Sequence, residues 1–429
     1  MIAKISKIIK ACRVCGSKKI ISLLSLGNLY ISNFIDVKKS AQSIKNPLKQ
    51  PLELVFCDPN SRGCGLVQLR HTCSPELLYR NYWYRSGVNQ SMMESLLDIA
   101  QKTELIAKPK SGDYIIDIGS NDATLFRFYK TKNLNLVGFE PAKNLIPYAK
   151  KICSSAEYIN DFFSFKNWQK KFGEKKAKII TAIAMFYDLD DPNEFISDIV
   201  KCLDKKGTFV IQMSYLPSML QQNAFDNICH EHLEYYSLKS LKNLLERHKL
   251  EVFDVELNDV NGGSFRTYIQ HKSCRPKSAR VRKLESFENG LKLTQKKTYQ
   301  DFAARVIDLK KKLYDFIKKE TIKGKKIYVY GASTKGNTLL QFCNLDKKLI
   351  KAAADRNHDK WGKKTVGTLI PIISEERARK EKPDYFLILP WHFLKEFMER
   401  EKDYLKSGGK FIVPLPKFKI ICYTDLRKR

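Results

Sequence analysis

The sequence predicts an α/β protein with a central doubly wound sheet, a small cysteine-rich domain before it and a second sheet of the same Rossmann-like kind after it. Three observations carry this prediction. A chain of 429 residues exceeds what one hydrophobic core usually organises. Apolar segments alternate with amphipathic ones from about residue 111, and cysteine pairs lie near the N-terminus. We expect domains at residues 1–80, 81–275 and 321–429, with a helical connector at 276–320.

Composition excludes several classes of protein. With 43% hydrophobic residues the chain has enough apolar surface to fold, and its longest apolar runs, at 179–187 and 385–390, are far shorter than the roughly 20 residues of a membrane span. The first residues lack the apolar core of a secretion signal, and the eleven cysteines are an odd number. We therefore expect a cytoplasmic protein that is not attached to a membrane.

The net charge of +31 would suit a nucleic-acid binder or an enzyme with a phosphorylated substrate. The basic residues are spread along the whole chain, and no aromatic-and-glycine nucleic-acid motif accompanies them. This favours an ordinary solvated surface over a binding stripe, so no nucleic-acid partner is expected.

The N-terminal region contains two cysteine pairs, each followed by glycine. Cys12 and Cys15 have the spacing of a zinc knuckle, whereas six residues separate Cys57 from Cys64. Four thiolates complete a tetrahedral structural Zn²⁺ site and leave no open position for catalysis. The alternative is a set of buried free thiols. If zinc is bound, its binding energy is part of the folding energy of this short segment.

The central region begins with the pattern of a nucleoside-binding crevice. An apolar strand reaches Asp117, Gly119 allows a tight turn, and a helix is expected to open at 123–129. The next strand ends at Glu140, 23 residues after Asp117, where such sheets hold ribose hydroxyls, and Asp161 lies where an adenine amino group could donate to it. The turn lacks the phosphate-binding Gly-x-Gly-x-x-Gly pattern. This favours a cofactor without phosphates, S-adenosylmethionine being the common one, over a sheet with no cofactor.

The connector and the C-terminal region follow a second such pattern. Apolar residues recur at helical spacing at positions 302, 306, 309, 313 and 316, which indicates core packing. A strand at 326–330 then leads to the turn from Gly331 to Gly336, a helix, and a strand ending at Asp355. Asn337 and Thr338 replace the Lys-Ser/Thr of a P-loop, which excludes a nucleoside triphosphatase. The helix start and Lys335 can still hold an anion.

The segment around His230, Glu231 and His232 concentrates groups that titrate near neutral pH. If extended, it would place both histidines on one face; if helical, they would diverge. A metal site, a buried structural pair and general acid/base catalysis are the alternatives, and the absence of an evident third ligand favours the last. The turn from Asn261 to Arg266 is read equally well as a binding loop or an ordinary hairpin.

Taken together, the motifs resemble the C-methyltransferases of nucleotide-linked deoxysugars, enzymes of bacterial sugar and polysaccharide pathways. The resemblance extends over nearly the whole chain. Besides the cysteine pairs, its motifs are Cys64-Gly-Leu-Val-Gln-Leu69, Tyr82-Trp-Tyr-Arg-Ser-Gly87, Asp117-Ile-Gly-Ser-Asn-Asp122, Cys229-His-Glu-His232, Asn261-Gly-Gly-Ser264, Tyr330-Gly-Ala-Ser-Thr-Lys-Gly-Asn-Thr338, Asp355-Arg-Asn357 and Pro414-Leu-Pro416. Three positions depart from the relatives: Cys229 replaces a frequent tyrosine, Asp188 a histidine and Ala123 a glycine.

The resemblance implies S-adenosylmethionine in the central domain and a nucleotide-linked 4-keto sugar between the central and C-terminal domains. It implies His232 as the base that removes a proton next to the ketone, a task for a group that titrates near pH 7. We expect His230, Tyr82 and Tyr84 to stabilise the enolate and Glu231 to orient a histidine. The remaining expected contacts are Asp117, Gly119, Ser120, Asn121, Asp122, Glu140, Pro141 and Asp161 for the cofactor, and Asn261, Arg266, Tyr330, Lys335 and Asn337 for the sugar substrate.

Two other functions compete with this hypothesis. A methyltransferase acting on oxygen, or on an acceptor other than a sugar, would use the same cofactor half. A zinc-containing nucleic-acid-binding module would explain the charge and the cysteines, with steep salt dependence of binding. For the favoured enzyme we expect a monomer or a weak homo-oligomer.

Overall fold

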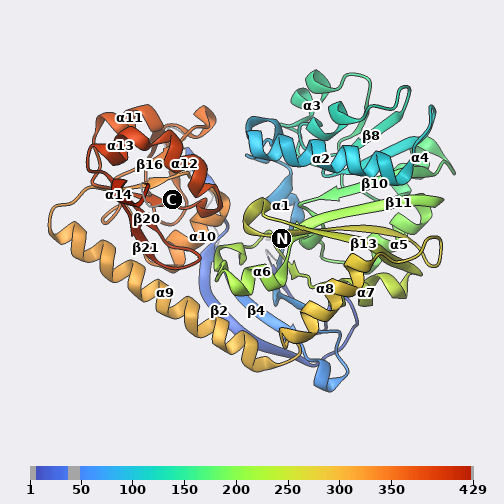
Figure 1. Ribbon diagram of the computed structural model, residues 1–429, viewed down its shortest axis with the longest axis horizontal. Helices are drawn as coiled ribbons and strands as arrows, with labels where there is room; N and C mark the ends of the chain where they lie inside the picture. Colours follow the sequence, from blue (N-terminus) through green and yellow to red (C-terminus); the bar gives the residue numbers. More distant parts are fainter. Residues whose placement is uncertain (1–5, 37–48, 427–429) are drawn as a thin grey trace, which may run out of the picture.

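The computed structural model describes residues 6–36 and 49–426 and contains two large sheets joined through a smaller one (Figure 1). The central sheet and its helices form the lobe on the right of Figure 1, and the C-terminal sheet with its helices forms the lobe on the left. The fold class expected from the sequence is confirmed. No helix among the described residues is long and apolar enough to cross a bilayer.

The central sheet has seven strands in the order β13-β14-β11-β10-β7-β8-β9. The five strands from β11 to β9 are parallel, and β14 and β13 form an antiparallel hairpin at one edge. The strands are β7 (Tyr114–Ile118), β8 (Asn135–Phe139), β9 (Glu157–Ile159), β10 (Ala177–Ile183), β11 (Leu203–Ser214), β13 (Leu250–Asn258) and β14 (Ser264–His271). The turn at 261–266 joins the two strands of this hairpin.

Helices cover both faces of this sheet, because successive residues of β7 pack into different clusters. Ile115 packs with Phe126 on one face, whereas Ile116 packs with Trp168 and Ile196 on the other. These helices are α2 (Gln90–Ala107), α3 (Ile146–Ile152), α4 (Phe165–Phe172), α5 (Pro192–Cys202) and α7 (Leu238–Arg247). Helix α6 (Leu216–Gln221) instead packs with the N-terminal and C-terminal sheets. The helix expected at 123–129 is a short 3-10 helix, η3 (Thr124–Phe128).

The N-terminal sheet has the order β12-β5-β4-β2 and is antiparallel. Its strands are β2 (Ile20–Tyr30), β4 (Lys49–Cys57), β5 (Val67–Leu69) and β12 (Glu234–Tyr235). Two short pairs flank it: β1 (Ser6–Ile8) with β6 (His71–Cys73), and β3 (Phe34–Asp36) with β17 (Lys363–Thr365). Because β12 follows His232 directly, the N-terminal sheet holds the end of the histidine segment.

The C-terminal sheet has the order β18-β16-β15-β19-β20-β21 and is parallel except for β21. Its strands are β15 (Ile327–Tyr330), β16 (Ala353–Asp355), β18 (Ile372–Ser374), β19 (Tyr385–Ile388), β20 (Lys410–Val413) and β21 (Lys419–Ile421). The helices of this region are α10 (Thr334–Phe342), α11 (Glu375–Lys380), α12 (Leu394–Arg400), α13 (Lys402–Lys406) and α14 (Tyr423–Leu426). Strand β15, the Gly331 turn and α10 follow one another as expected.

The connector consists of two helices, α8 (Ala279–Gly290) and α9 (Lys296–Ile322), with a break between them. Helix α9 runs along the lower edge of the C-terminal lobe (Figure 1). Phe302, Val306, Leu309 and Leu313 of α9 are buried and Phe316 partly so, which confirms the core-packing reading. They belong to one hydrophobic cluster that also contains Leu52 and Phe56 of β4 and much of the C-terminal sheet. The N-terminal sheet and the C-terminal lobe therefore share a core.

Candidate active site

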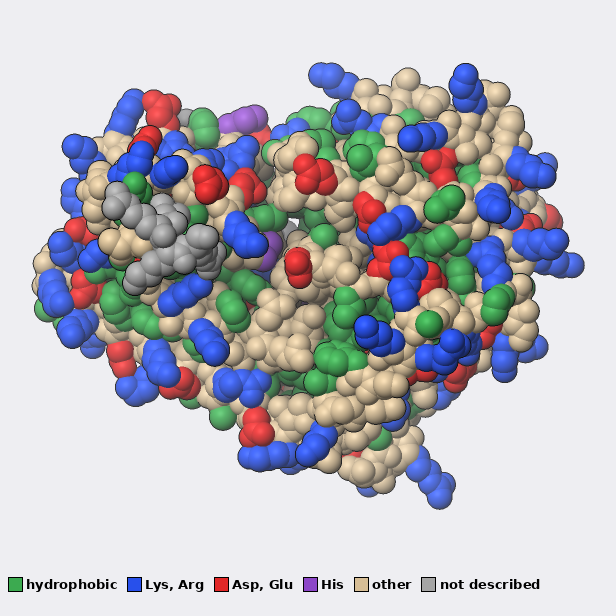
Figure 2. Space-filling model, viewed as in Figure 1, with side chains coloured by type: hydrophobic (Ala, Val, Ile, Leu, Met, Phe, Trp, Pro, Cys, Tyr) green, Lys and Arg blue, Asp and Glu red, His purple; other side chains and the backbone are tan. Residues whose placement is uncertain are grey.

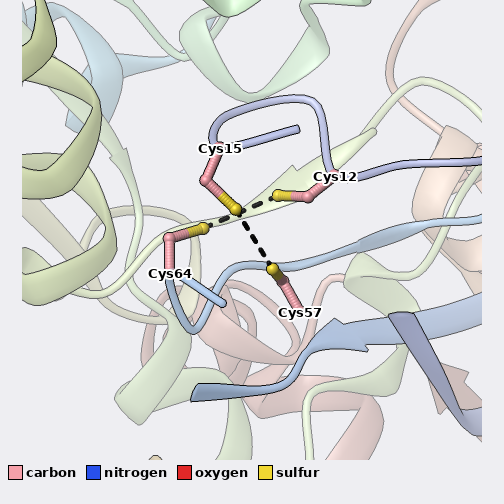
Figure 3. A group of neighbouring side chains, drawn as sticks. All are labelled: Cys12, Cys15, Cys57 and Cys64. Atoms are coloured by element: carbon pink, nitrogen blue, oxygen red, sulfur yellow. Dashed lines mark hydrogen bonds between the residues drawn. The ribbon is translucent and has the colours of Figure 1, made fainter. Parts of the chain in front are cut away.

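The four predicted zinc ligands converge, with their sulfur atoms directed toward one another (Figure 3). Sγ of Cys12 lies 3.6 Å from Sγ of Cys64, and Sγ of Cys15 lies 3.4 Å from Sγ of Cys57. Zn–S bonds of about 2.3 Å in a tetrahedron require S–S separations of about 3.8 Å. All four sulfur atoms lie within 4.8 Å of one another, so the donor set fits structural Zn²⁺ and leaves no open coordination position.

The turn after β7 forms one end of a cavity of about 820 Å³. Gly119 adopts a φ of +70°, and a Cβ at this position would lie 3.2 Å from Cγ of Met185, so this position favours glycine. Glu140 at the end of β8 accepts hydrogen bonds from the main-chain nitrogens of Asn121 (2.7 Å) and Ala142 (2.8 Å). Ala123 has a left-handed φ of +61°.

This end of the cavity fits S-adenosylmethionine in both polarity and charge. Oγ of Ser120 is buried and has no hydrogen-bond partner among the described residues, and Glu140 faces the cavity beside it. Although the chain carries a large positive net charge, the central domain lines the cavity with no lysine or arginine. Its charged lining residues are all acidic: Asp117, Glu140, Asp188, Asp190, Asp191, Glu194, Asp198, Asp226 and Glu231. Such a lining favours a cationic ligand such as a sulfonium.

Of the predicted cofactor contacts, Asp117, Gly119, Ser120, Asn121, Glu140 and Pro141 line the cavity. Asp122 is buried and instead accepts hydrogen bonds from Thr124 and from the main-chain nitrogen of Gly87. Asp161 does not line the cavity. Its carboxylate is held by Arg80 at 3.0 Å and by the main-chain nitrogen of Phe162, so the predicted contact with adenine is not supported.

The histidine segment forms a turn in which the main-chain nitrogen of His232 donates to the carbonyl of Cys229 at 3.1 Å. It is therefore neither extended nor helical, and the two histidines point to different places. His232 lines the cavity, and its Nδ1 lies 2.9 Å from the main-chain oxygen of Asn227. Since a carbonyl can only accept, Nδ1 carries the proton and Nε2 keeps a free lone pair. Burial and the charge of Lys335 lower the pKa of His232 to about 3, so the ring is neutral near pH 7. This pKa lies well below the value near 7 expected of the base from the sequence, which makes the ring a weaker base before substrate binds.

His230 is placed away from the reaction centre. Nε2 of His230 lies 3.1 Å from the main-chain oxygen of Gln50 in β4, and the ring lines neither of the two large cavities. The position of His230 therefore gives no support to the prediction that it stabilises an enolate. Its contact with β4 is the structural role that was left open for this histidine.

A metal site is one alternative for this segment, since potential ligand atoms of Cys229, Glu231 and His232 lie within 4.8 Å of one another. The ammonium of Lys335 acts on all three groups and opposes a second cation at this place. With Nδ1 of His232 committed to Asn227, the arrangement favours a proton-transferring imidazole over a metal ligand.

Other polar groups surround His232 in the cavity. Tyr82 and Tyr84 line it, as predicted for enolate contacts, and so do Tyr187 and Asp188. Glu231 lines it too, and burial raises the pKa of its carboxyl to about 7. The Tyr79 hydroxyl donates to the main-chain oxygen of Glu231 at 3.0 Å and so stabilises the turn. Burial and Glu231 also raise the pKa of Asp188 well above its usual range.

The C-terminal lobe closes the other end of the cavity with the turn after β15. Gly331 has a φ of +84°, and Asp355 at the end of β16 accepts a hydrogen bond from the main-chain nitrogen of Ala332 at 2.8 Å. Lys335 and Lys360 line the cavity from this side. A second cavity of about 590 Å³ adjoins the first and is lined by Tyr82, Glu231 and Gly331, among others.

Three of the predicted substrate contacts, Asn261, Tyr330 and Lys335, lie at the cavities, and two do not. Arg266 of β14 is 2% exposed and ion-pairs with Asp98 of α2 at 2.8 Å and with Glu256 of β13 at 3.4 Å. Asn337 is buried in α10 and donates to the main-chain oxygen of Asn33. Both therefore stabilise the fold, and neither lines a cavity. Tyr330 lines the second cavity, but its hydroxyl is engaged by Glu401 and Arg400.

Sequence reasoning missed Asn227 and His392. Asn227 stands three residues before His230 in the same segment, so the segment itself was the available signal. His392 lines the cavity shortly after β19 ends at Ile388. Polar residues after parallel strands meet at one sheet edge, and this rule could have identified it.

The chain matches three protein-family models in succession: a zinc binding domain at residues 12–79, a methyltransferase domain at 84–255 and a C-methyltransferase C-terminal domain at 259–416. Among curated proteins it is 30% identical to the C-methyltransferase NovU of Streptomyces niveus over 423 residues, which cover 96% of this chain and 97% of NovU.

Solved structures with a similar fold are more distant. The plantazolicin methyltransferase BpumL, in complex with SAH, is 14% identical with a TM-score of 0.34 and covers 42% of this chain and 82% of its own. An S-adenosylmethionine-dependent methyltransferase from Clostridium acetobutylicum is 10% identical with a TM-score of 0.34 and covers 42% and 92%. The family models and NovU carry the assignment: the chain belongs to the family of S-adenosylmethionine-dependent C-methyltransferases with an N-terminal zinc-binding domain.

Proposed function

We propose that this enzyme methylates a carbon next to the ketone of a nucleotide-linked 4-keto-deoxysugar, with His232 as the base. One observation carries the proposal. An imidazole whose Nδ1 is fixed by Asn227 lines the same cavity as the acidic crevice of the central domain. A C–H group next to a ketone is weakly acidic, and a neutral imidazole with a free Nε2 is the kind of group that removes its proton.

The surrounding side chains suit this chemistry. Nε2 of His232 takes the proton, and the C–H electron pair moves toward the ketone oxygen. The imidazolium that results is stabilised by Glu231 when its carboxylate is ionised, which happens increasingly above about pH 7. Hydroxyl donors such as Tyr82 and Tyr84 are available to the oxygen. S-adenosylmethionine, held by the Gly119 turn and Glu140, supplies an electrophilic methyl group.

The second cavity suits the nucleotide part of such a substrate. It is lined by the cations Arg356, Lys360 and Arg400 together with their carboxylate partners Glu396, Asp355 and Glu375, and by the aromatic rings of Phe34 and Trp83. Guanidinium groups bind phosphates in paired hydrogen bonds, and aromatic rings stack on nucleobases. Because this cavity adjoins the one that contains His232, a nucleotide here would leave the attached sugar within reach of the base.

Methylation of an oxygen is the competing function, because it needs the same cofactor and only a base near a hydroxyl. A nucleotide-linked 4-keto sugar carrying deuterium on the carbons next to the ketone distinguishes the two. After incubation with S-adenosylmethionine, mass spectrometry should show the gain of one methyl group and the loss of a deuterium. A methylated product that retains every deuterium in a non-exchanging control buffer would overturn C-methylation at that carbon.

A further inference from the structure

Lys335, a residue of the C-terminal lobe, extends toward His232, the proposed base of the central domain. It lies in the first turn of α10, whose N-cap Ser333 accepts a hydrogen bond from the main-chain nitrogen of Gly336. Nζ of Lys335 donates to Oδ1 of Asn227 at 2.6 Å. Helix α10 thus delivers an ammonium group into the segment that contains His232.

Asn227 connects this ammonium to the imidazole. Its side-chain oxygen accepts from Lys335, while its main-chain oxygen accepts from Nδ1 of His232 at 2.9 Å and from the hydroxyl of Tyr235 at 3.2 Å. A single asparagine therefore fixes both the position of the cation and the tautomer of the base.

The positive charge of Lys335 lacks a carboxylate partner. No carboxylate among the described residues lies within ion-pair distance of its Nζ, whereas Lys360 on the same cavity pairs with Asp355 at 3.2 Å. The positive charge of Lys335 lowers the pKa of six nearby titratable groups: Asp188, Asp226, Cys229, Glu231, His232 and His392. Burial raises the pKa of the three carboxyl groups, so they neutralise the ammonium incompletely.

We propose that Lys335 is a catalytic residue whose ammonium stabilises the negative oxygen of the enolate, while its hydrogen bond to Asn227 supports the residue that fixes the tautomer of His232. This rests on the proposed function. As Nε2 of His232 takes the carbon-bound proton, the C–H electron pair forms the C=C bond of the enolate and the carbonyl π pair moves onto oxygen. Lys335 keeps its own proton and donates a hydrogen bond to that oxygen. The sequence reading of Lys335 as an anion-binding residue is thus redirected from a phosphate to the enolate.

The first test separates these two anions. In K335M, kcat should fall roughly 10²- to 10³-fold, the usual loss for one oxyanion donor, while KM and the affinity for a nucleoside diphosphate change little. K335R should recover part of kcat, because it keeps a cation. A lysine that binds phosphate would give the opposite result: weaker nucleoside diphosphate binding and higher KM at nearly unchanged kcat. That outcome would overturn the proposal.

The second test needs no substrate. In protein with ¹⁵N-labelled histidine, the ring shifts of His232, assigned by comparison with H232N, report its protonation. Removing the nearby positive charge in K335M should shift the pKa of His232 upward, whereas K360M, which removes a paired lysine from the same cavity, should leave it unchanged. An identical titration in K335M and the wild type would refute the coupling. The two proposals can fail separately. If the wild type methylates no keto sugar but K335M still shifts the pKa of His232, the proposed substrate is wrong and the coupling of Lys335 to His232 is retained.

Discussion

The crevices of the central and C-terminal sheets are built from the same backbone device. In each, a strand runs into a glycine with positive φ, and an acid at the end of the next strand accepts a hydrogen bond from the turn. Glu140 accepts from Asn121 in the central crevice, and Asp355 accepts from Ala332 in the C-terminal one. The strongest difference between them is charge.

Among Lys, Arg, Asp and Glu, the central domain contributes only acidic side chains to the first cavity, whereas the C-terminal lobe contributes Lys335 and Lys360 beside Asp355. Arg356 and Arg400 line the adjoining cavity together with Glu375 and Glu396. The comparison shows that the glycine turn forms the binding position, while charged side chains from neighbouring elements determine which ligand charge is favoured. Elsewhere, on the face shown in Figure 2, lysines and arginines are scattered among acidic residues and form no single stripe. The central crevice therefore differs from this mixed surface in its acidic lining, whereas the C-terminal crevice combines cations with acids.

The largest expected effect is the loss of turnover on replacing His232, which lies in the cavity between the two crevices, at their junction. In H232N, kcat should fall by roughly 10²- to 10⁴-fold, the usual contribution of a general base, while the affinities for S-adenosylmethionine and for a nucleoside diphosphate stay as in the wild type. Steady-state kinetics and calorimetric binding measure these quantities. Unchanged turnover would remove His232 from the mechanism, and loss of either affinity would show that the crevices are not independent of the junction.

The two glycine turns should differ in their tolerance of a methyl group. In G331A the new Cβ would lie 2.5 Å from Cγ of Pro390, a rigid ring, and the left-handed φ adds strain, so unfolding should become easier by roughly 2–5 kcal/mol. In G119A the neighbour is the flexible Met185 at 3.2 Å, and about 1–2 kcal/mol is expected. Denaturant unfolding checks the order, which the reverse ranking would contradict.

Charge-specific binding should separate the crevices. E140A removes a carboxylate expected to hold ribose hydroxyls and should weaken S-adenosylmethionine binding by roughly 10- to 100-fold, since hydrogen bonds to charged groups are worth about 1.5–3 kcal/mol. R356A, at the second cavity, should instead weaken nucleoside diphosphate binding. Calorimetric titration of both variants with both ligands gives a crossed pattern. Equal losses for both ligands in either variant would mean that the division of ligands between the crevices is wrong.

The smallest expected effect concerns pH. Burial raises the pKa of Asp117 to about 7, so this carboxyl gains its negative charge as pH rises through that value. Preference for S-adenosylmethionine, which carries a positive sulfur, over S-adenosylhomocysteine, which does not, should therefore increase roughly fivefold with pH, because one charge across a partly buried site is worth about 1 kcal/mol. D117N should abolish the increase. A pH-independent ratio in the wild type would remove Asp117 as its source.

Local patterns identified the features that depend on few neighbours. The Gly119 and Gly331 turns, the acids after β8 and β16 and the four cysteines follow from spacing, because backbone conformation and metal geometry demand these residue types at these intervals. The histidine segment was harder. Whether His230 and His232 share a face depends on the turn that ends in β12, and that strand forms only by pairing with residues 67 and 68, far away in the sequence.

Arg266 is a second residue whose role depends on partners that are distant in the sequence. A lone arginine after a glycine turn resembles a ligand contact until Asp98 and Glu256, from two other elements, are brought to it by the fold. Asp161 was misread for a similar reason, because Arg80 occupies its carboxylate. In each case a distant partner of opposite charge decided the role, and a single sequence does not reveal that partner.

The pairing of β12 with β5 has a practical consequence. Glu234 and Tyr235, two and three residues after His232, are aligned with Gln68 and Val67, and Cys57 and Cys64 flank the loop that leads into β5. A shortened gene beginning after residue 80 would therefore not yield a compact core, since it would remove the strand with which the segment after His232 pairs. Exchanging the N-terminal domain between homologues would therefore also replace the strand that supports the segment after His232.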